Sequence, residues 1–299
     1  GPIVLYSDIE DQIRERNHSL SLLEEGFRYF TIGLASKMLI ANVMGSLWTE
    51  AKMVGFASLS TPMAWISMFA FSFQIYFDFQ GYSLMAIGLG KMMGFKIPQN
   101  FNHPYTARSV GEFWRRWHIT LGTWFREYVY IPLGGSRVSK GRMIFNLFVV
   151  WMLTGFWHGA GWNFVVWGLL NGIFVLIAHM MRKANLKMNL YLAWFLMFIG
   201  LILTRILFVA DSFSDAWYVT YTLFDISNLR FDNLYYIDPY LQSFYLVLAL
   251  GLAVGAKNSM ELAENFPEME GVFISNDQMA LGAMHAAKEM GINIPEDLA

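Results

Sequence analysis

One stretch decides the fold: Met143-Ile-Phe-Asn-Leu-Phe-Val-Val-Trp-Met-Leu-Thr-Gly-Phe-Trp-His158-Gly-Ala-Gly-Trp-Asn163. It belongs to a longer run, from Met143 to Met181, that contains no Asp, Glu, Lys or Arg. Water-soluble domains rarely hold so long an uncharged run, whereas a bilayer needs roughly twenty apolar residues for each helical crossing. An ionisable side chain at membrane depth is costly, and His is suited to moving protons near neutral pH. The run therefore predicts a membrane protein and makes His158 the first candidate for a functional residue.

The composition agrees with a membrane protein. Apolar residues make up 56% of the chain and charged residues only 15%, whereas a soluble domain carries about 25% charged residues. The formal net charge of -2 is too small to indicate a nucleic-acid partner. The absence of cysteine excludes disulfides, thiolate metal sites and a cysteine nucleophile. We predict an all-α polytopic membrane protein, a bundle of spanning helices with re-entrant or interfacial helices.

Basic residues on both sides of the uncharged run predict its topology. They are Arg137, Lys140 and Arg142 before it, and Arg182, Lys183 and Lys187 after it. Loops rich in Lys and Arg tend to stay cytoplasmic, so both ends of the run should face the cytoplasm. The chain must then turn, and the helix-weakening Gly159-Ala-Gly161 is the expected place. The first arm, about fifteen residues or roughly 22 Å of helix, is shorter than a hydrocarbon core of about 30 Å, which places His158 inside the membrane.

Other apolar segments predict further crossings, at residues 26–45, 61–90, 190–209 and 240–256. The segment 61–90 is long enough for one tilted helix, or for a helix followed by a re-entrant piece. Residues 6–25 are rich in charge and predict a solvated or interfacial helix leading into the membrane. We interpret Asp78, Arg205 and His179 as helix-pairing or interface residues rather than as groups that do chemistry.

A second histidine, His118, lies in the segment 111–137, where aromatic residues alternate with Arg115, Arg116 and other charged residues. This pattern is typical of a segment that dips to headgroup level or lines a polar cavity without crossing. The alternative for the segment is a basic-aromatic membrane anchor, and the alternative for His158 is a packing histidine. We expect no metal site, because the histidines lack ligand spacing and no carboxylate stands close to His158.

Five sequence blocks follow one another in a fixed order: Phe101-Asn-His-Pro-Tyr105, Glu112-Phe-Trp-Arg-Arg-Trp-His118, Trp124-Phe-Arg-Glu-Tyr128, Tyr130-Ile-Pro-Leu-Gly-Gly135 and Gly155-Phe-Trp-His-Gly-Ala-Gly-Trp-Asn163. They resemble the signatures of membrane-bound O-acyltransferases, and within that family those of its alginate O-acetylation branch. The resemblance implies that His158 is the catalytic residue and that His118 is the second histidine of the active site.

The candidate substrate-binding residues are Arg115, Arg116, Trp157 and Asn163. Arg115, Arg116 and the Gly134-Gly135 turn are candidates for contacts with an anionic donor, or alternatively for cytoplasmic anchoring. His158 is expected to accept the proton of the acceptor hydroxyl, while His118 orients the reactants or holds developing negative charge.

The resemblance also implies substrates and surroundings. The expected reaction moves an acyl group, with acetyl as the expected one, from a cytoplasmic thioester to a hydroxyl of an exopolysaccharide or of a carrier protein. The expected co-substrate is acetyl-CoA or an acyl carrier, with no tightly bound cofactor. The expected partners are the lipid bilayer of a bacterial inner membrane, the donor, and the polysaccharide or a periplasmic or extracellular protein that carries acetyl groups, with no nucleic acid.

The chain departs from the family pattern at two positions, Leu84, where relatives usually have Asp, and Gly122, where they usually have Ser. The resemblance also implies several N-terminal crossings that precede this chain, so residues 1–266 are expected to be a partial acyltransferase core.

The pattern of residues 267–299 predicts a strand, a turn and a helix, and this segment resembles a fragment of the effector-binding domain of LacI-type regulators. This α/β fragment is too short to bury a core alone, and we do not expect an independent domain. Either a chimeric join or a genuine fused module would explain it.

Two other classes of function stay open. A multi-pass transporter, or an inactive membrane component of a polysaccharide export or modification complex, would also place polar residues in the membrane. A sugar-sensing regulator is suggested by the tail alone, and the lack of a basic DNA-binding region argues against it.

Overall fold

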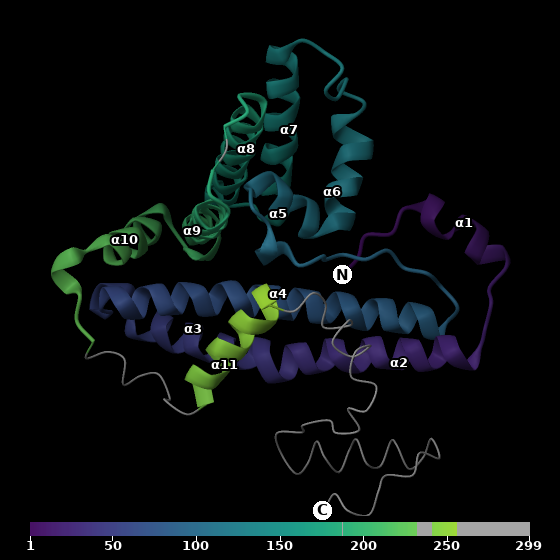
Figure 1. Ribbon diagram of the computed structural model, residues 1–299, viewed down its shortest axis with the longest axis horizontal. Helices are drawn as coiled ribbons and strands as arrows, with labels where there is room; N and C mark the ends of the chain where they lie inside the picture. Colours follow the sequence, from purple (N-terminus) through teal and green to yellow (C-terminus); the bar gives the residue numbers. More distant parts are fainter. Residues whose placement is uncertain (187, 232–240, 256–299) are drawn as a thin grey trace, which may run out of the picture. The chain divides into compact units, whose positions relative to one another are not determined.

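The computed structural model describes residues 1–186, 188–231 and 241–255. Within these ranges every regular element is a helix and none is a strand, as the predicted all-α class requires (Figure 1). The predicted α/β fragment at 267–299 and its boundary at 266/267 lie outside the described residues, so both stay predictions.

The first part of the chain builds a pair of long helices that lie side by side (Figure 1). After the short α1 (Tyr6–Arg14), α2 (Leu20–Ala35) continues through a π-helical turn (Ser36–Ala41) into α3 (Asn42–Val54). The Ser19 hydroxyl accepts a hydrogen bond from the Leu22 backbone N–H and so caps the start of α2. The return helix is α4 (Thr61–Met92), whose first turn contains a proline.

Glycines allow α2 and α4 to approach closely. Gly26 and Gly33 of α2 face Gly88 and Gly81 of α4, so the two helices run antiparallel. A Cβ atom added at Gly26 would lie 2.6 Å from the Gly88 carbonyl oxygen, and one added at Gly81 would lie 2.5 Å from the Gly33 carbonyl oxygen. Small residues at such contacts let helix backbones touch in apolar surroundings, where packing replaces the hydrophobic effect as the driving force.

An ion pair between Lys37 and Asp78 also joins the two long helices. It agrees with the interpretation of Asp78 as a helix-pairing residue.

The dipping segment forms short helices, α5 (Val110–Arg116) and α6 (Ile119–Phe125), followed by a π-helical turn (Arg126–Tyr130). The break falls at Trp117, whose extended backbone ends α5, and at His118, whose φ of 45° lies in the left-handed region just before α6. None of these pieces is long enough to cross a bilayer, as predicted.

The uncharged run folds as the predicted hairpin, α7 (Lys140–His158) and α8 (Trp162–Lys183), with the turn at residues 159–161. Gly155 and Gly168 lie at the contact, because a Cβ on either would collide with the backbone of the other helix. The chain then continues as α9 (Leu190–Val209), α10 (Phe213–Phe224) and α11 (Leu241–Leu250). The remaining short helical turns are Phe56–Ser58, Pro104–Thr106, Ile226–Asn228 and Gly251–Gly255.

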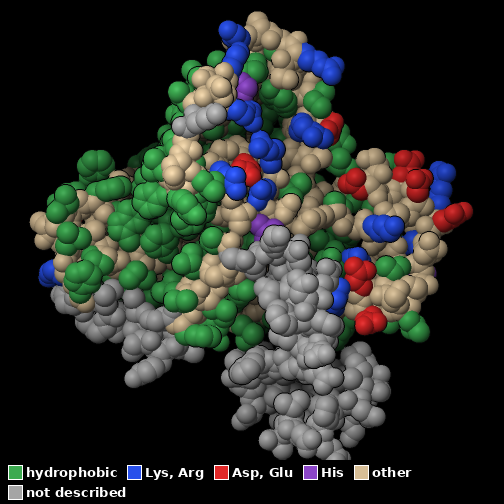
Figure 2. All heavy atoms as spheres, viewed as in Figure 1, with side chains coloured by type: hydrophobic (Ala, Val, Ile, Leu, Met, Phe, Trp, Pro, Cys, Tyr) green, Lys and Arg blue, Asp and Glu red, His purple; other side chains and the backbone are tan. Residues whose placement is uncertain are grey.

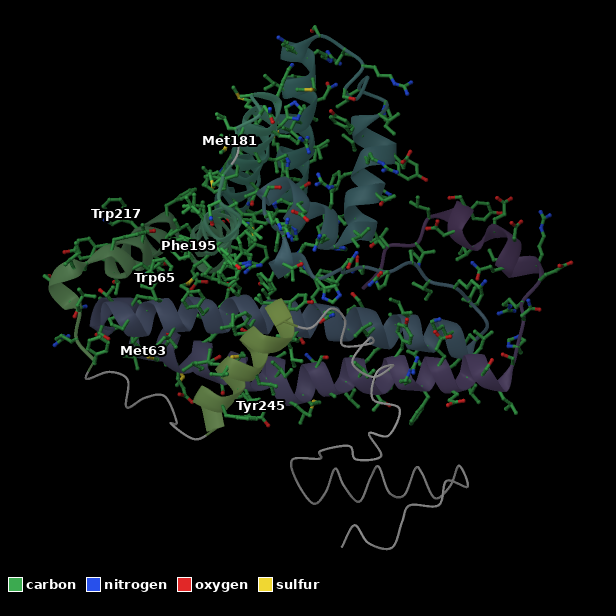
Figure 3. All side chains as sticks on the ribbon, in the orientation of Figure 1. Met63, Trp65, Met181, Phe195, Trp217 and Tyr245 are labelled. Atoms are coloured by element: carbon green, nitrogen blue, oxygen red, sulfur yellow. The ribbon has the colours of Figure 1, made fainter. Side chains whose placement is uncertain are left out.

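Hydrogen bonds tie α10 to the start of α4. The Trp65 indole N–H donates to the Leu223 carbonyl at 2.8 Å, and the Thr61 hydroxyl lies 2.9 Å from the Thr222 carbonyl. Figure 3 shows Trp65 on α4 and Trp217 on the neighbouring α10.

Three helical segments of the described chain are long and apolar enough to cross a membrane: Leu20–Val54, α8 and α9. They include the crossings predicted at 26–45 and 190–209. In α8, only 22% of the most apolar 18-residue stretch is buried inside the protein. Most of the apolar surface of this helix is therefore available to lipid.

Two other predicted crossings are not among the candidate spans of the described chain. The segment 61–90 is the single uninterrupted helix α4, which is the first of its two predicted alternatives. At 240–256 the described part contains an apolar helix shorter than 18 residues, which is short for a crossing.

Replacing Gly81 with Leu should push α4 away from α2, because the new side chain would occupy the place of the Gly33 carbonyl. We expect the melting temperature of the full-length protein in detergent to fall by about 3–10 °C. Gly141→Leu is the control, since a Cβ at Gly141 meets no atom within 4 Å. Equal melting temperatures for the two variants would contradict the close helix contact.

Candidate active site

His118 is held in one orientation by a buried amide. Its side chain is 5% exposed, and its Nδ1 lies 3.0 Å from Asn100 Oδ1. The Thr120 backbone N–H, which can only donate, points at the same atom at 3.4 Å, so that atom is the amide oxygen. Nδ1 of His118 therefore donates its proton to Asn100, and in the neutral ring Nε2 carries the free lone pair.

Asn100 is itself fixed from several parts of the chain. Its Nδ2 donates to Ser83 Oγ of α4 at 3.0 Å, and its Oδ1 also accepts from the Thr120 hydroxyl at 2.9 Å. That hydroxyl accepts in turn from the Ile3 backbone N–H at 2.9 Å. Sequence analysis missed Asn100, which stands just before the first signature block, because nothing in its spacing separates it from an ordinary loop asparagine.

His118 lies between α5 and α6, outside the candidate spans. Burial lowers the pKa of its imidazole below the ordinary value, and repulsion from nearby His158 lowers that pKa further. The ring is therefore neutral at neutral pH and can accept a hydrogen bond or a proton at Nε2.

His158 is the last residue of α7 and sits among aromatic rings. Its ring centroid lies 5.0 Å from those of Trp157 and Trp167 and 5.5 Å from that of Phe208. The Trp157 ring also lies 6.1 Å from His118, so the two imidazoles contact the same indole. The structure thus brings together three residues that the sequence singled out.

A cavity of about 60 Å³ opens beside His158. It is bounded by Trp117, which follows α5, and by residues of α4, α5, α8 and α9: Ile75, Phe79, Phe113, Trp114, Trp167, Leu201, Thr204, Arg205 and Phe208. The histidine is therefore adjacent to enclosed space that a small group can occupy, rather than packed on every side.

Arg205 lines this cavity, although its position in α9 led us to interpret it as a helix-pairing residue. The side chain is 7% exposed and lies over the rings of Tyr105, Phe113 and Trp117, at 5.4, 5.9 and 5.3 Å from their centroids. The sequence contained one signal for a functional role, because Arg205 is the one charged residue in the otherwise uncharged α9.

The neighbouring arginines Arg115 and Arg116 have different surroundings. Arg116 bonds the Glu112 carboxylate at 2.7 Å and the Thr106 hydroxyl at 2.6 Å, so it braces the turn before α5. Arg115 is exposed and lines a second, larger cavity.

The larger cavity, of about 820 Å³, lies between the start of α5, the end of α8 and the start of α9. Its basic side chains are Arg108, Arg115, His179 and Arg182. Lys and Arg side chains gather over this part of the molecule in Figure 2, and Met181, labelled in Figure 3, also lines the cavity. A basic cavity of this size suits an extended anionic ligand.

Asn163 and the Gly134-Gly135 turn make contacts within the protein. Asn163 Nδ2 donates to the carbonyls of Leu207 and Ala210 at 3.1 and 3.2 Å, which ties the start of α8 to the end of α9. Gly134 and Gly135 have φ values of 100° and 55°, which glycine adopts without strain. A substrate contact for Asn163 or for this turn stays a prediction.

Among the described residues, no group of three or more His, Asp and Glu side chains could hold a metal ion.

The profile described as MBOAT, membrane-bound O-acyltransferase family, matches residues 1–210 of the chain. A second profile, the periplasmic binding protein-like domain, matches residues 244–299 and fits the resemblance of the tail to LacI-type regulators. This match begins before the predicted boundary at 267.

Curated proteins give the same family. The chain is 37% identical over 235 residues to a probable alginate O-acetylase of Pseudomonas aeruginosa, covering 78% of this chain and 45% of that protein. It is 41% identical over 223 residues to a peptidoglycan O-acetyltransferase of Helicobacter pylori, covering 72% and 42%. A teichoic acid D-alanyltransferase of Streptococcus thermophilus is 31% identical over 194 residues, covering 59% and 46%. The chain thus spans less than half the length of these relatives.

Asn100→Ala should destabilise the site, because it leaves His118 Nδ1 and the Thr120 hydroxyl without their shared acceptor. We expect the free energy of unfolding to fall by about 1–3 kcal/mol, measured by denaturation of the full-length protein in detergent. Asn102→Ala, in the same loop but exposed, should change it by less than about 0.5 kcal/mol. A loss no larger at Asn100 than at Asn102 would refute the network.

Proposed function

The chain belongs to the membrane-bound O-acyltransferase family, and from this premise we propose that it carries the catalytic site of an enzyme that transfers an acetyl group from a thioester to a hydroxyl. One observation carries the proposal. His158 stands at the turn of the apolar hairpin, beside a small cavity and against the same indole as His118.

In the proposed reaction the acceptor hydroxyl oxygen attacks the carbonyl carbon of the thioester, and His158 takes the hydroxyl proton. The tetrahedral intermediate then collapses with cleavage of the carbon–sulfur bond. The departing thiolate receives the proton from His158, so the products are an ester and a free thiol. General base catalysis of this kind contributes about 10²–10⁴-fold in rate.

His118 serves as the orienting residue in this scheme. Its Nδ1 is occupied by Asn100, so the neutral ring presents a lone pair at Nε2 rather than a donor. A lone pair can accept a hydrogen bond from a second hydroxyl of the acceptor and so position the attacking one, whose proton goes to His158, whereas stabilising negative charge would need a proton at Nε2. The geometry supports the orienting role over the charge-stabilising one.

The larger cavity is the proposed donor site. Its arginines suit the phosphates of a donor such as acetyl-CoA, or an acidic acyl carrier protein. The basic flanks of the hairpin predict that this end faces the cytoplasm, where such thioesters are found.

The two cavities are bounded by the same helices. Gly200 of α9 lines the larger cavity and the next residue, Leu201, lines the smaller one. On α8, Phe174 lines the larger cavity and Trp167 lines the smaller one.

The size of the His158 cavity favours a short acyl group, since about 60 Å³ corresponds to roughly two water molecules. The names of the relatives point to cell-surface polymers as acceptors. We therefore propose a polysaccharide, or an extracytoplasmic protein that carries acetyl groups, as acceptor, and a multi-pass position in a bacterial inner membrane.

His158→Ala in the full-length protein should lower acetyl transfer from acetyl-CoA by about 10²–10⁴-fold, because the base is lost. Labelled acetyl incorporated into polymer and free thiol released are measured together in isolated membranes. His18→Ala, an exposed histidine near the start of α2, should keep the wild-type rate. A full rate in His158→Ala would remove His158 from its role, and an absence of thiol release from the wild type would favour the transporter alternative.

Arg115→Gln should raise the KM for acetyl-CoA by about tenfold while changing kcat less than about twofold, because it removes a phosphate contact and leaves His158 intact. Arg14→Gln, at the exposed end of α1, is the matched control and should leave both constants unchanged. An unchanged KM in Arg115→Gln would place the donor elsewhere.

A further inference from the structure

We propose that Arg205 is a second catalytic residue, whose Nη1 donates a hydrogen bond to the carbonyl oxygen of the acyl group under transfer. The inference rests on the proposed function and assigns a role that the signature blocks do not include. It is carried by the position of Arg205 on the His158 cavity and by the hydrogen-bonding state of its guanidinium group.

Burying the charged side chain of Arg205 in α9 is unfavourable in free energy. Guanidinium keeps its charge at any pH a protein meets, and here it lies in an otherwise uncharged helix with 7% of the side chain exposed. No ion pair of Arg205 is found within the described chain. Removing such a charge from water without an oppositely charged partner is costly, so a purely structural role is better served by an apolar residue.

The aromatic rings around Arg205 hold the guanidinium but do not complete its hydrogen bonds. Tyr105, Phe113 and Trp117 offer ring faces within 6 Å, and these contacts offset part of the desolvation cost. The Nη1 atom is buried and has no hydrogen-bond partner in the part of the chain that the structure describes. A fixed guanidinium with a free N–H is a preorganised donor.

The cavity contains a second free donor. Trp114 Nε1 is also buried without a partner among the described residues, and Trp114 lines the same space of about 60 Å³ as Arg205 and His158. Two unpaired N–H groups and one imidazole around so small a space call for a ligand that offers an acceptor atom. A carbonyl oxygen meets that requirement, and it is the atom on which charge develops during acyl transfer.

The chemistry then assigns each electron pair and proton. As the hydroxyl oxygen bonds to the carbonyl carbon, the π pair of the carbonyl moves onto its oxygen, and the hydroxyl proton goes to His158. Arg205 Nη1 donates to the resulting oxyanion, which forms a charge-assisted bond in a site that excludes water. When the carbonyl reforms, the carbon–sulfur bond breaks and the thiolate takes the proton from His158. Arg205 neither gains nor loses a proton.

Arg205→Met in the full-length protein is the decisive variant. Methionine has a similar length and no charge, so the variant should fold with an unchanged or higher melting temperature. We expect kcat with acetyl-CoA to fall by about 10²–10³-fold, as for other donors to an oxyanion, with the KM for acetyl-CoA changed less than about threefold. Arg14→Met, far along the chain and exposed, should retain the wild-type kcat.

A kcat within about threefold of wild type in folded Arg205→Met would overturn this inference alone, provided that His158→Ala has lost activity. If Arg205→Met does not fold, Arg205→Lys decides. Lysine keeps the charge but lacks the planar fork, so kcat should fall at least about tenfold, and a wild-type kcat would overturn the assignment. Absence of thiol release from the wild-type protein would instead overturn the proposed function, and this inference with it.

Discussion

The candidate site depends on the insertion of one indole between the two arms of the apolar hairpin. Trp114 of the short helix α5 lies 5.0 Å from the Trp151 ring of α7 and 5.7 Å from the Trp167 ring of α8, edge to face in both cases. Such contacts bury a large area and fix ring geometry. Because α5 borders both cavities, this packing sets where the basic cavity ends and where the space beside His158 begins.

Polar side chains in the apolar interior divide into two groups. Asn100 and Asn163 use their amides to position His118 and to connect helices, which satisfies them within the protein. Arg205 and Trp114 keep donors without partners in the described structure, and both face the same cavity. Since unpaired buried donors are costly, their concentration beside one histidine distinguishes a place for a ligand from ordinary packing.

Much of the framework was predictable, because charge and glycine act locally. The lack of charge between Met143 and Met181 predicted the hairpin, and Gly159 with Gly161 predicted its turn. The different surroundings of Arg115 and Arg116 were not predictable. The two residues are adjacent in one signature block, yet Arg115 lines the larger cavity and Arg116 forms an ion pair with Glu112. The uninterrupted course of helix α4 likewise depends on helices that pack against it, and no local signal marks the difference from a helix with a re-entrant piece.

The sequence by itself determined that this is a helical membrane protein, that an apolar hairpin carries His158 at its turn, and that the chain resembles membrane acyltransferases. Those features follow from the type and order of residues that are close together in the chain. Only the tertiary structure decided that Asn100 orients His118 and that Arg205 shares a cavity with His158. The reason is that hydrogen bonds and cavities join residues far apart in the chain, and their formation depends on how helices pack rather than on what each helix contains.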